Sequence, residues 1–137
     1  MVAAPPARIW AALVAPSRWW NGQHSYSGDA RNLTLEPRAG GCFCERVPKT
    51  KATVEHGRVI FAQPGALLRL SAALGPLQAE AVTGTLTWTL KAVEGGTQLT
   101  QTYVVGGYVR GGAERLAAPV DAVMTEQFGR LVAFAGR

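Results

Sequence analysis

The clearest periodic pattern in the chain lies near its C-terminus. Within Glu114–Phe134, apolar residues recur at steps of three and four, which is the spacing of one face of an α-helix. Gln127 falls on the same stripe. Pro119 lacks an amide proton and suits only a first turn, so we expect regular helix to start within a few residues of it. The predicted apolar face consists of Leu116, Val120, Val123, Met124, Leu131 and Phe134.

The preceding chain alternates apolar and polar residues with a period of two, as half-buried strands do. The strongest example is Thr83–Val93, where Leu86, Trp88 and Leu90 share one face and threonines share the other. Glu94–Thr97 is predicted to be the hairpin turn that follows it. Weaker alternation between turn residues predicts further strands at Asn32–Glu36, Cys42–Val47, Val54–Ala62, Leu67–Leu74 and Gln98–Val105.

Two short helices are predicted near the N-terminus. Pro5 and Pro6 suit a first helical turn, and Pro16 ends the segment that they open. A second short turn is expected to contain Trp19 and Trp20. With about six strands and one long final helix, this order predicts an α+β fold, a curved antiparallel sheet wrapped around the C-terminal helix. One helix does not fill the concave side of such a sheet, so we expect a cavity between them.

The composition is that of a globular domain. The chain has 137 residues, 47% hydrophobic and 17% charged, so we predict a single domain over residues 1–137. No apolar run approaches the ~18 residues that a membrane span requires, and the first ten residues do not resemble a signal peptide. We therefore expect a cytoplasmic protein that does not bind a membrane.

The charge distribution argues against a nucleic-acid partner. Fourteen basic and nine acidic residues give a net charge of +5. The excess is spread along the chain, and Arg46–Lys51 is the nearest approach to a cluster. Nucleic-acid binding requires basic residues gathered on one face, so we expect none.

No cofactor or metal motif is present in the sequence. Cys42 and Cys44 are the only cysteines, and their spacing in a strand is too close for an easy disulfide. A lone C-x-C is weak as a zinc motif, although His24 and His56 could complete a set of four ligands. Nothing fixes the distance between these residues, so we expect two small thiols. The glycine pairs do not have the spacing of a phosphate-binding loop.

A set of short motifs, each weak alone, runs in order along nearly the whole chain. They are Ala3–Leu13 with the Trp-rich turn Arg18–Trp20, Pro37–Glu45 with its G-G-x-F-x-E pattern, Glu55–Val59 with Gln63–Gly65, and Gly95–Thr100. This order resembles the START-like, helix-grip superfamily called SRPBCC. The closest resemblance is to the branch of heat-shock chaperone ATPase activator homologues, near the polyketide-cyclase-like proteins.

The resemblance implies a helix-grip fold with a hydrophobic ligand cavity between sheet and helix. Members of the superfamily include lipid and hormone carriers, aromatic polyketide cyclases and proteins with no known reaction, so the fold does not settle the activity. The family usually has a full strand before the first helix, whereas only Met1–Ala3 precede Ala4 here. We therefore predict a weak sheet edge near residues 1–4 or a homodimer formed there.

The predicted site combines inward strand residues with the inner face of the last helix. Most of the apolar members would also serve as ordinary core. Glu45, Gln101 and Gln127 are more informative, because burying a polar group without a partner is costly. They either converge on a polar group of a ligand or satisfy the backbone and each other. The predicted ligand-binding residues are Trp20, Tyr26, Phe43, Glu45, Phe61, Trp88, Gln101, Tyr103, Val120, Met124 and Gln127, with Trp20 and Tyr26 at the mouth.

Three functions follow from these residues and from the resemblance. The first is binding of a small hydrophobic molecule without chemistry. The second is a cyclase, dehydratase or hydrolase acting on an aromatic or polyketide-like substrate, with Glu45 or a histidine moving protons. The third is a co-chaperone-like interaction protein.

Strict alternation turns His56 away from the pocket, so it faces the cavity only if Gly57 forms a bulge.

Overall fold

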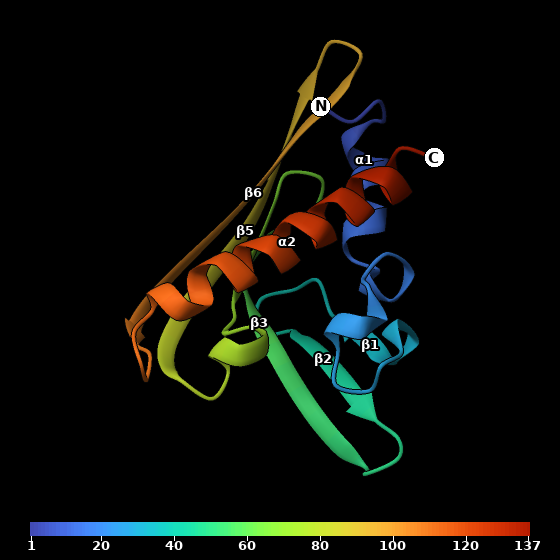
Figure 1. Ribbon diagram of the computed structural model, residues 1–137. Helices are drawn as coiled ribbons and strands as arrows, with labels where there is room; N and C mark the ends of the chain where they lie inside the picture. The colour runs from blue at the N-terminus through green and yellow to red at the C-terminus, as the bar shows by residue number, and fades with distance from the viewer.

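The computed structural model describes residues 1–137 as an antiparallel sheet wrapped around a long C-terminal helix (Figure 1). The six strands form a meander in which each strand pairs with the next one along the chain. The predicted α+β helix-grip class is confirmed. The strands are β1 (Leu33–Leu35), β2 (Cys42–Val47), β3 (Ala52–Gln63), β4 (Leu67–Ser71), β5 (Ala81–Val93) and β6 (Gly96–Tyr108).

The C-terminal helix α2 (Glu114–Ala135) crosses the concave side of the sheet (Figure 1). It buries one stripe, as the periodicity predicts, formed by Leu116, Met124, Gln127, Leu131 and Ala135. The expectation for Pro119 is wrong, because this residue lies inside the helix, five positions after its first residue. The missing amide proton removes one hydrogen bond near the start of the helix.

The N-terminal segment packs against the far end of α2. Helix α1 (Pro6–Leu13) buries Ile9 and Leu13 and lies beside the C-terminal half of α2 (Figure 1). The second predicted helix is a single 3-10 turn, Pro16–Arg18, followed directly by Trp19 and Trp20. The Trp19 indole nitrogen donates to the Ala12 carbonyl at 2.9 Å, which ties this turn to α1.

Strand β3 departs from simple alternation at two places. Phe43 pairs with Gly57 and Cys44 pairs with Glu55, so His56 is an extra residue in the ladder with β2. Such a bulge interrupts the alternation of side chains between the two faces of the sheet. His56 and Gly57 are consequently both buried, and the histidine faces the concave side.

The second irregularity reverses the expectation for Phe61. Val59 pairs with Leu70 and Phe61 with Arg69, which leaves Ile60 as the extra residue. Val59 is buried, whereas Phe61 is 45% exposed on the opposite face. The prediction that Phe61 points inward is therefore wrong. The bulge adds one residue to the strand, so Phe61 lies on the face opposite to the one that strict alternation predicts.

The two cysteines are joined in a disulfide, Cys42–Cys44, contrary to the expected pair of thiols. Their Cα atoms are 5.4 Å apart, within the usual range for a disulfide and closer than a fully extended strand allows. The register shift between Phe43 and Cys44 lies inside this segment. The sequence argument failed because it assumed a regular strand.

The open edge of β6 is covered only at its beginning. Val2 and Thr97 exchange two backbone hydrogen bonds of 2.8 and 2.9 Å, in an isolated antiparallel bridge. Beyond this bridge the edge has no neighbouring strand, and Val104 and Tyr108 are exposed. The weak edge thus lies along β6, and residues 1–4 cover only its start. The homodimer stays a prediction that sedimentation would test.

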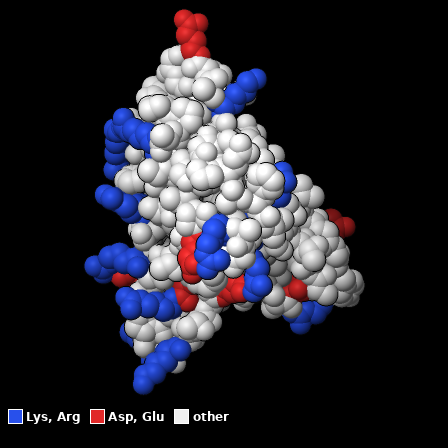
Figure 2. Space-filling view, turned by 180° about the vertical axis from the view of Figure 1, so that it is seen from behind, with Lys and Arg blue, Asp and Glu red and all other residues white.

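Charged side chains on the face away from α2 form no single patch. Lys and Arg project in separate groups along one side and the lower end of this face, and carboxylates lie among them (Figure 2). Several are paired, including Arg58 with Glu55 and Arg38 with Glu36. No helix in the chain combines the length and hydrophobicity needed to cross a lipid bilayer.

Candidate functional site

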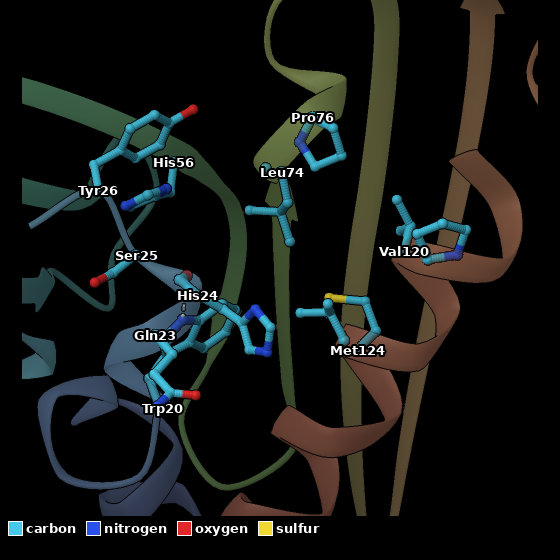
Figure 3. Close-up of a pocket in the computed structure, with 13 residues that line it drawn as sticks. Trp20, Gln23, His24, Ser25, Tyr26, His56, Leu74, Pro76, Val120 and Met124 are labelled. Carbon is cyan, nitrogen blue, oxygen red and sulfur yellow. Dashed lines mark hydrogen bonds between the residues drawn. The ribbon is translucent and has the colours of Figure 1, made fainter. Parts of the chain in front are cut away.

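A pocket of about 480 Å³ lies between the first half of α2, the turn after β4 and the loop that follows Trp20. Met124 and Val120 face Leu74 and Pro76 across it, while Trp20 and His24 lie on the third side (Figure 3). Tyr26 and His56 lie together at one end of the pocket (Figure 3). Its full lining is Trp20, Gln23, His24, Ser25, Tyr26, His56, Leu74, Gly75, Pro76, Pro119, Val120, Val123 and Met124.

The loop that forms one wall is fastened to α2. The amide of Asn21 donates to Oε1 of Gln127 at 2.9 Å, and Nδ2 of Asn21 donates to Oε2 of Glu126 at 3.1 Å. One turn further along α2, Nε of Arg130 donates to the Trp19 carbonyl at 2.7 Å. The helix therefore fixes the position of Trp20, whose indole nitrogen donates to the His24 carbonyl at 3.0 Å.

A buried histidine–carboxylate pair stands at the Tyr26 end of the pocket. Nε2 of His56 lies 2.8 Å from Oε1 of Glu45, and the two side chains are 9% and 0% exposed. The bulge in β3 brings His56 to this side of the sheet. Rings of Tyr26 and Phe43 flank the imidazole, with centroids 5.8 and 5.1 Å away. The histidine is therefore held between two aromatic side chains and a carboxylate.

Glu45 remains ionised in this buried position. Burial alone would raise the pKa of its carboxyl, but hydrogen bonds from Ser27, His56 and Tyr26 outweigh burial and hold the pKa below its ordinary value. The amides of Tyr26 and Ser27 donate to its two oxygens at 3.2 and 2.7 Å. Glu45 thus fastens the loop to β2 and also orients His56.

A second histidine–carboxylate pair lies at the same pocket but closer to solvent. Nε2 of His24 lies 3.3 Å from Oε2 of Glu126, and the two side chains are 38% and 45% exposed. Water weakens an ion pair at such exposure. The two histidine–carboxylate pairs therefore contain the same chemical groups, but one pair is buried and the other is partly exposed to solvent.

The structure divides the predicted site residues into three groups. Trp20, Tyr26, Val120 and Met124 line the pocket. Phe43 and Glu45 lie behind His56 and position it. The remaining predicted residues lie outside this pocket. Phe61 is on the outer face of the sheet, and Tyr103 lines a neighbouring hollow. Trp88, Gln101 and Gln127 make contacts within the framework of sheet, helix and loop.

The predicted polar residues Gln101 and Gln127 serve the framework. Oε1 of Gln101 accepts from the Trp88 indole at 2.8 Å, and its Nε2 donates to the Met124 carbonyl at 3.2 Å. Gln127 holds Asn21, and its buried Nε2 has no partner in the protein. Of the two alternatives, these glutamines follow the one in which polar residues satisfy the backbone and each other.

Tyr103 lines a smaller neighbouring hollow of about 300 Å³, which shares Val120 and Met124 with the main pocket. Its hydroxyl donates to the Ala72 carbonyl at 2.7 Å and accepts from the Leu74 amide at 3.0 Å. Burial raises the pKa of this phenol, an effect that the Leu74 hydrogen bond opposes. Tyr103 thus fixes the turn that carries Leu74 into the main pocket.

Sequence reasoning missed lining residues that lie in loops and turns. Gln23, Ser25, Gly75 and Pro76 belong to segments without periodicity, so no pattern could place them. Leu74 and Val123 carried a signal, since each lay on an apolar stripe. His56 carried the most useful signal, because Gly57 marked a possible bulge.

A family model described as "Activator of Hsp90 ATPase homolog 1-like protein" matches residues 3–136. The chain belongs to this family. It is a family of the SRPBCC superfamily, so the predicted family membership is confirmed. A domain of this type typically binds ligands. No curated protein matches the chain.

Solved structures of other proteins share this fold over nearly the whole length of the chain. A Mesorhizobium loti protein has 19% identity and a TM-score of 0.67, covering 97% of this chain and 90% of its own. A Rhodobacter sphaeroides protein has 28% identity and a TM-score of 0.60, covering 98% and 86%. The di-domain ARO/CYC protein StfQ from the steffimycin biosynthetic pathway has 14% identity and a TM-score of 0.61, covering 98% of this chain and 47% of its own.

Proposed function

We infer that this protein binds a small, largely hydrophobic molecule in the pocket between α2, the loop after Trp20 and the turn after β4. The observation that carries the proposal is the lining of this pocket, where Trp20, Leu74, Val120, Val123 and Met124 surround a volume of about 480 Å³. That volume falls in the range of pockets for small molecules. No lysine or arginine belongs to the lining, which favours an uncharged ligand.

The test uses an uncharged apolar dye, Nile red, and thermal unfolding. A ligand that binds only the folded state stabilises it by mass action. At about ten times the Kd, the expected stabilisation is roughly 1.4 kcal/mol, which raises Tm by several degrees. Met124→Trp fills the pocket and should remove this shift, because Met124 belongs to the lining and is buried.

Ala122→Trp is the matched control, since Ala122 lies on the exposed side of the same helix. Its Tm should rise with dye as in the native protein. A dye-induced shift that survives in Met124→Trp would place the ligand elsewhere.

An enzymatic function is the second candidate, and one observation favours it. It requires an imidazole or a carboxyl group that faces the cavity, and His56 meets this requirement. Orientation of a flexible substrate and proton transfer by a positioned side chain both contribute to cyclisation and dehydration chemistry. StfQ, a protein of similar fold, is described as an ARO/CYC protein.

A further inference from the structure

The two nitrogens of His56 have different surroundings. Nε2 contacts Oε1 of Glu45, which is ionised and can only accept a hydrogen bond, so Nε2 carries a hydrogen, and when the ring is neutral this is its only ring N–H. The lone pair of the neutral imidazole is therefore on Nδ1. This tautomer is fixed by a buried carboxylate and not by solvent.

Nδ1 of His56 has no hydrogen-bond partner in the protein. The only buried side-chain nitrogen or oxygen without a partner is Nε2 of Gln127, so Nδ1 of His56 retains access to the pocket that the ring lines. The phenol of Tyr26 does not serve as its partner, because it donates to Oε1 of Gln78 at 3.0 Å. An acceptor thus stands free at one end of a pocket whose surface is mostly apolar.

The charges around the pocket restrict what this acceptor can bind. The lining contains no lysine or arginine that would compensate a ligand already charged in solution. A hydroxyl that is neutral in water enters without that cost and can release its proton after binding. The resulting imidazolium would lie between the Glu45 carboxylate and the ligand oxygen, where both neighbours favour its charge.

We propose that the ligand is a hydrophobic molecule with one weakly acidic hydroxyl, of phenol or enol type, whose proton passes to Nδ1 of His56. The ligand O–H bond breaks, its electron pair stays on oxygen, and a bond forms between Nδ1 and the proton. Glu45 keeps its charge and its contact with Nε2 throughout. This inference rests on the proposed binding function and names the ligand class of that pocket.

His56 is a better proton acceptor for this purpose than His24. Both line the pocket and both face a carboxylate. The Glu45–His56 pair is almost entirely removed from solvent, whereas His24 and Glu126 are both more than a third exposed. An ion pair formed inside the protein is screened less than one at the surface.

The experiment compares two probes that differ in one group. Para-nitrophenol becomes yellow when its hydroxyl ionises, and para-nitroanisole is its methyl ether and does not ionise. At a pH where free para-nitrophenol is mostly protonated, the bound probe should be yellow. His56→Gln keeps a donor for Glu45 but takes up no proton; it should bind para-nitrophenol roughly tenfold or more weakly and without colour, the loss expected for one charge-assisted hydrogen bond.

Para-nitroanisole separates the outcomes. If neither probe binds the native protein, the proposed binding function fails. If both bind but bound para-nitrophenol stays colourless, binding stands and the proton transfer is overturned. If His24→Gln abolishes the colour and His56→Gln does not, the assignment to His56 is overturned. Equal affinity of native protein and His56→Gln for para-nitroanisole shows that the variant pocket is intact.

Discussion

Glu45 illustrates how one buried side chain can hold both the fold and the site together. Its oxygens accept hydrogen bonds from the amides of Tyr26 and Ser27, and one of them also contacts His56. The sequence identified Glu45 as an inward polar residue. It could not show that the carboxylate lies behind a histidine, because that depends on an irregular strand and on a loop without periodicity.

Replacement of this carboxylate should destabilise the fold in a pH-dependent way. Glu45→Gln retains the volume but turns an amide NH2 toward backbone donors, at a cost of roughly 1–3 kcal/mol. Because the pKa of Glu45 is lowered by folding, its contribution is complete above the ordinary pKa and disappears as pH falls through the lowered value. Urea unfolding should therefore show a large difference near neutrality that shrinks in acid.

The exposed carboxylate of Glu55 supplies a control for this measurement. It lies on the neighbouring strand and pairs with Arg58 at the surface. Glu55→Gln should alter the unfolding free energy by less than about 1 kcal/mol. A Glu45→Gln deficit that stays constant from neutral to acid pH would contradict the ionised, hydrogen-bonded state.

Among the elements, β3 shows best where sequence reasoning succeeds and where it stops. Its existence follows from the apolar alternation around Val59, and the strand is present. The side on which each residue lies does not follow, because two extra residues, His56 and Ile60, shift the order. The helix α2 was easier to predict, since its stripe depends on a longer run of residues.

The bulge beside His56 should depend on glycine at position 57. A Cβ at Gly57 would lie 2.8 Å from the Ala72 Cβ and 3.1 Å from the Ser71 carbonyl oxygen. We expect Gly57→Ala to destabilise the protein by roughly 1–3 kcal/mol, as overpacking does, and to displace His56. Thermal or urea unfolding measures the first effect, and the histidine proton resonances report the second.

Gly106→Ala is the matched control on β6. A Cβ there meets nothing within 4 Å, so the change should be neutral or slightly stabilising through the unfolded chain. Equal losses in the two variants would mean that close packing at the bulge is not the cause.

At the scale of the whole molecule, the arrangement that matters is a helix laid across a meander with a loop fastened to it. The order of hydrophobic segments was sufficient to predict the helix on the sheet, and the family match over residues 3–136 agrees with that part. It did not predict that the loop is fastened to the helix. The sequence predicted a cavity between the sheet and α2, whereas the pocket lies beside the first half of α2 and takes much of its wall from outside the sheet. About half of the lining residues come from the loop after Trp20 and the turn after β4, and among them only Leu74 lay on a periodic stripe.

The central claim is that a small hydrophobic molecule occupies this pocket, and the two methionines offer a direct measurement. Met124 lines the pocket and is 6% exposed, whereas Met1 is 75% exposed at the N-terminus. With methionine methyl groups labelled, nuclear magnetic resonance should show two methyl signals. Titration with para-nitroanisole should shift the Met124 signal and leave the Met1 signal in place. A Met124 signal that stays unmoved while the probe binds would contradict the account.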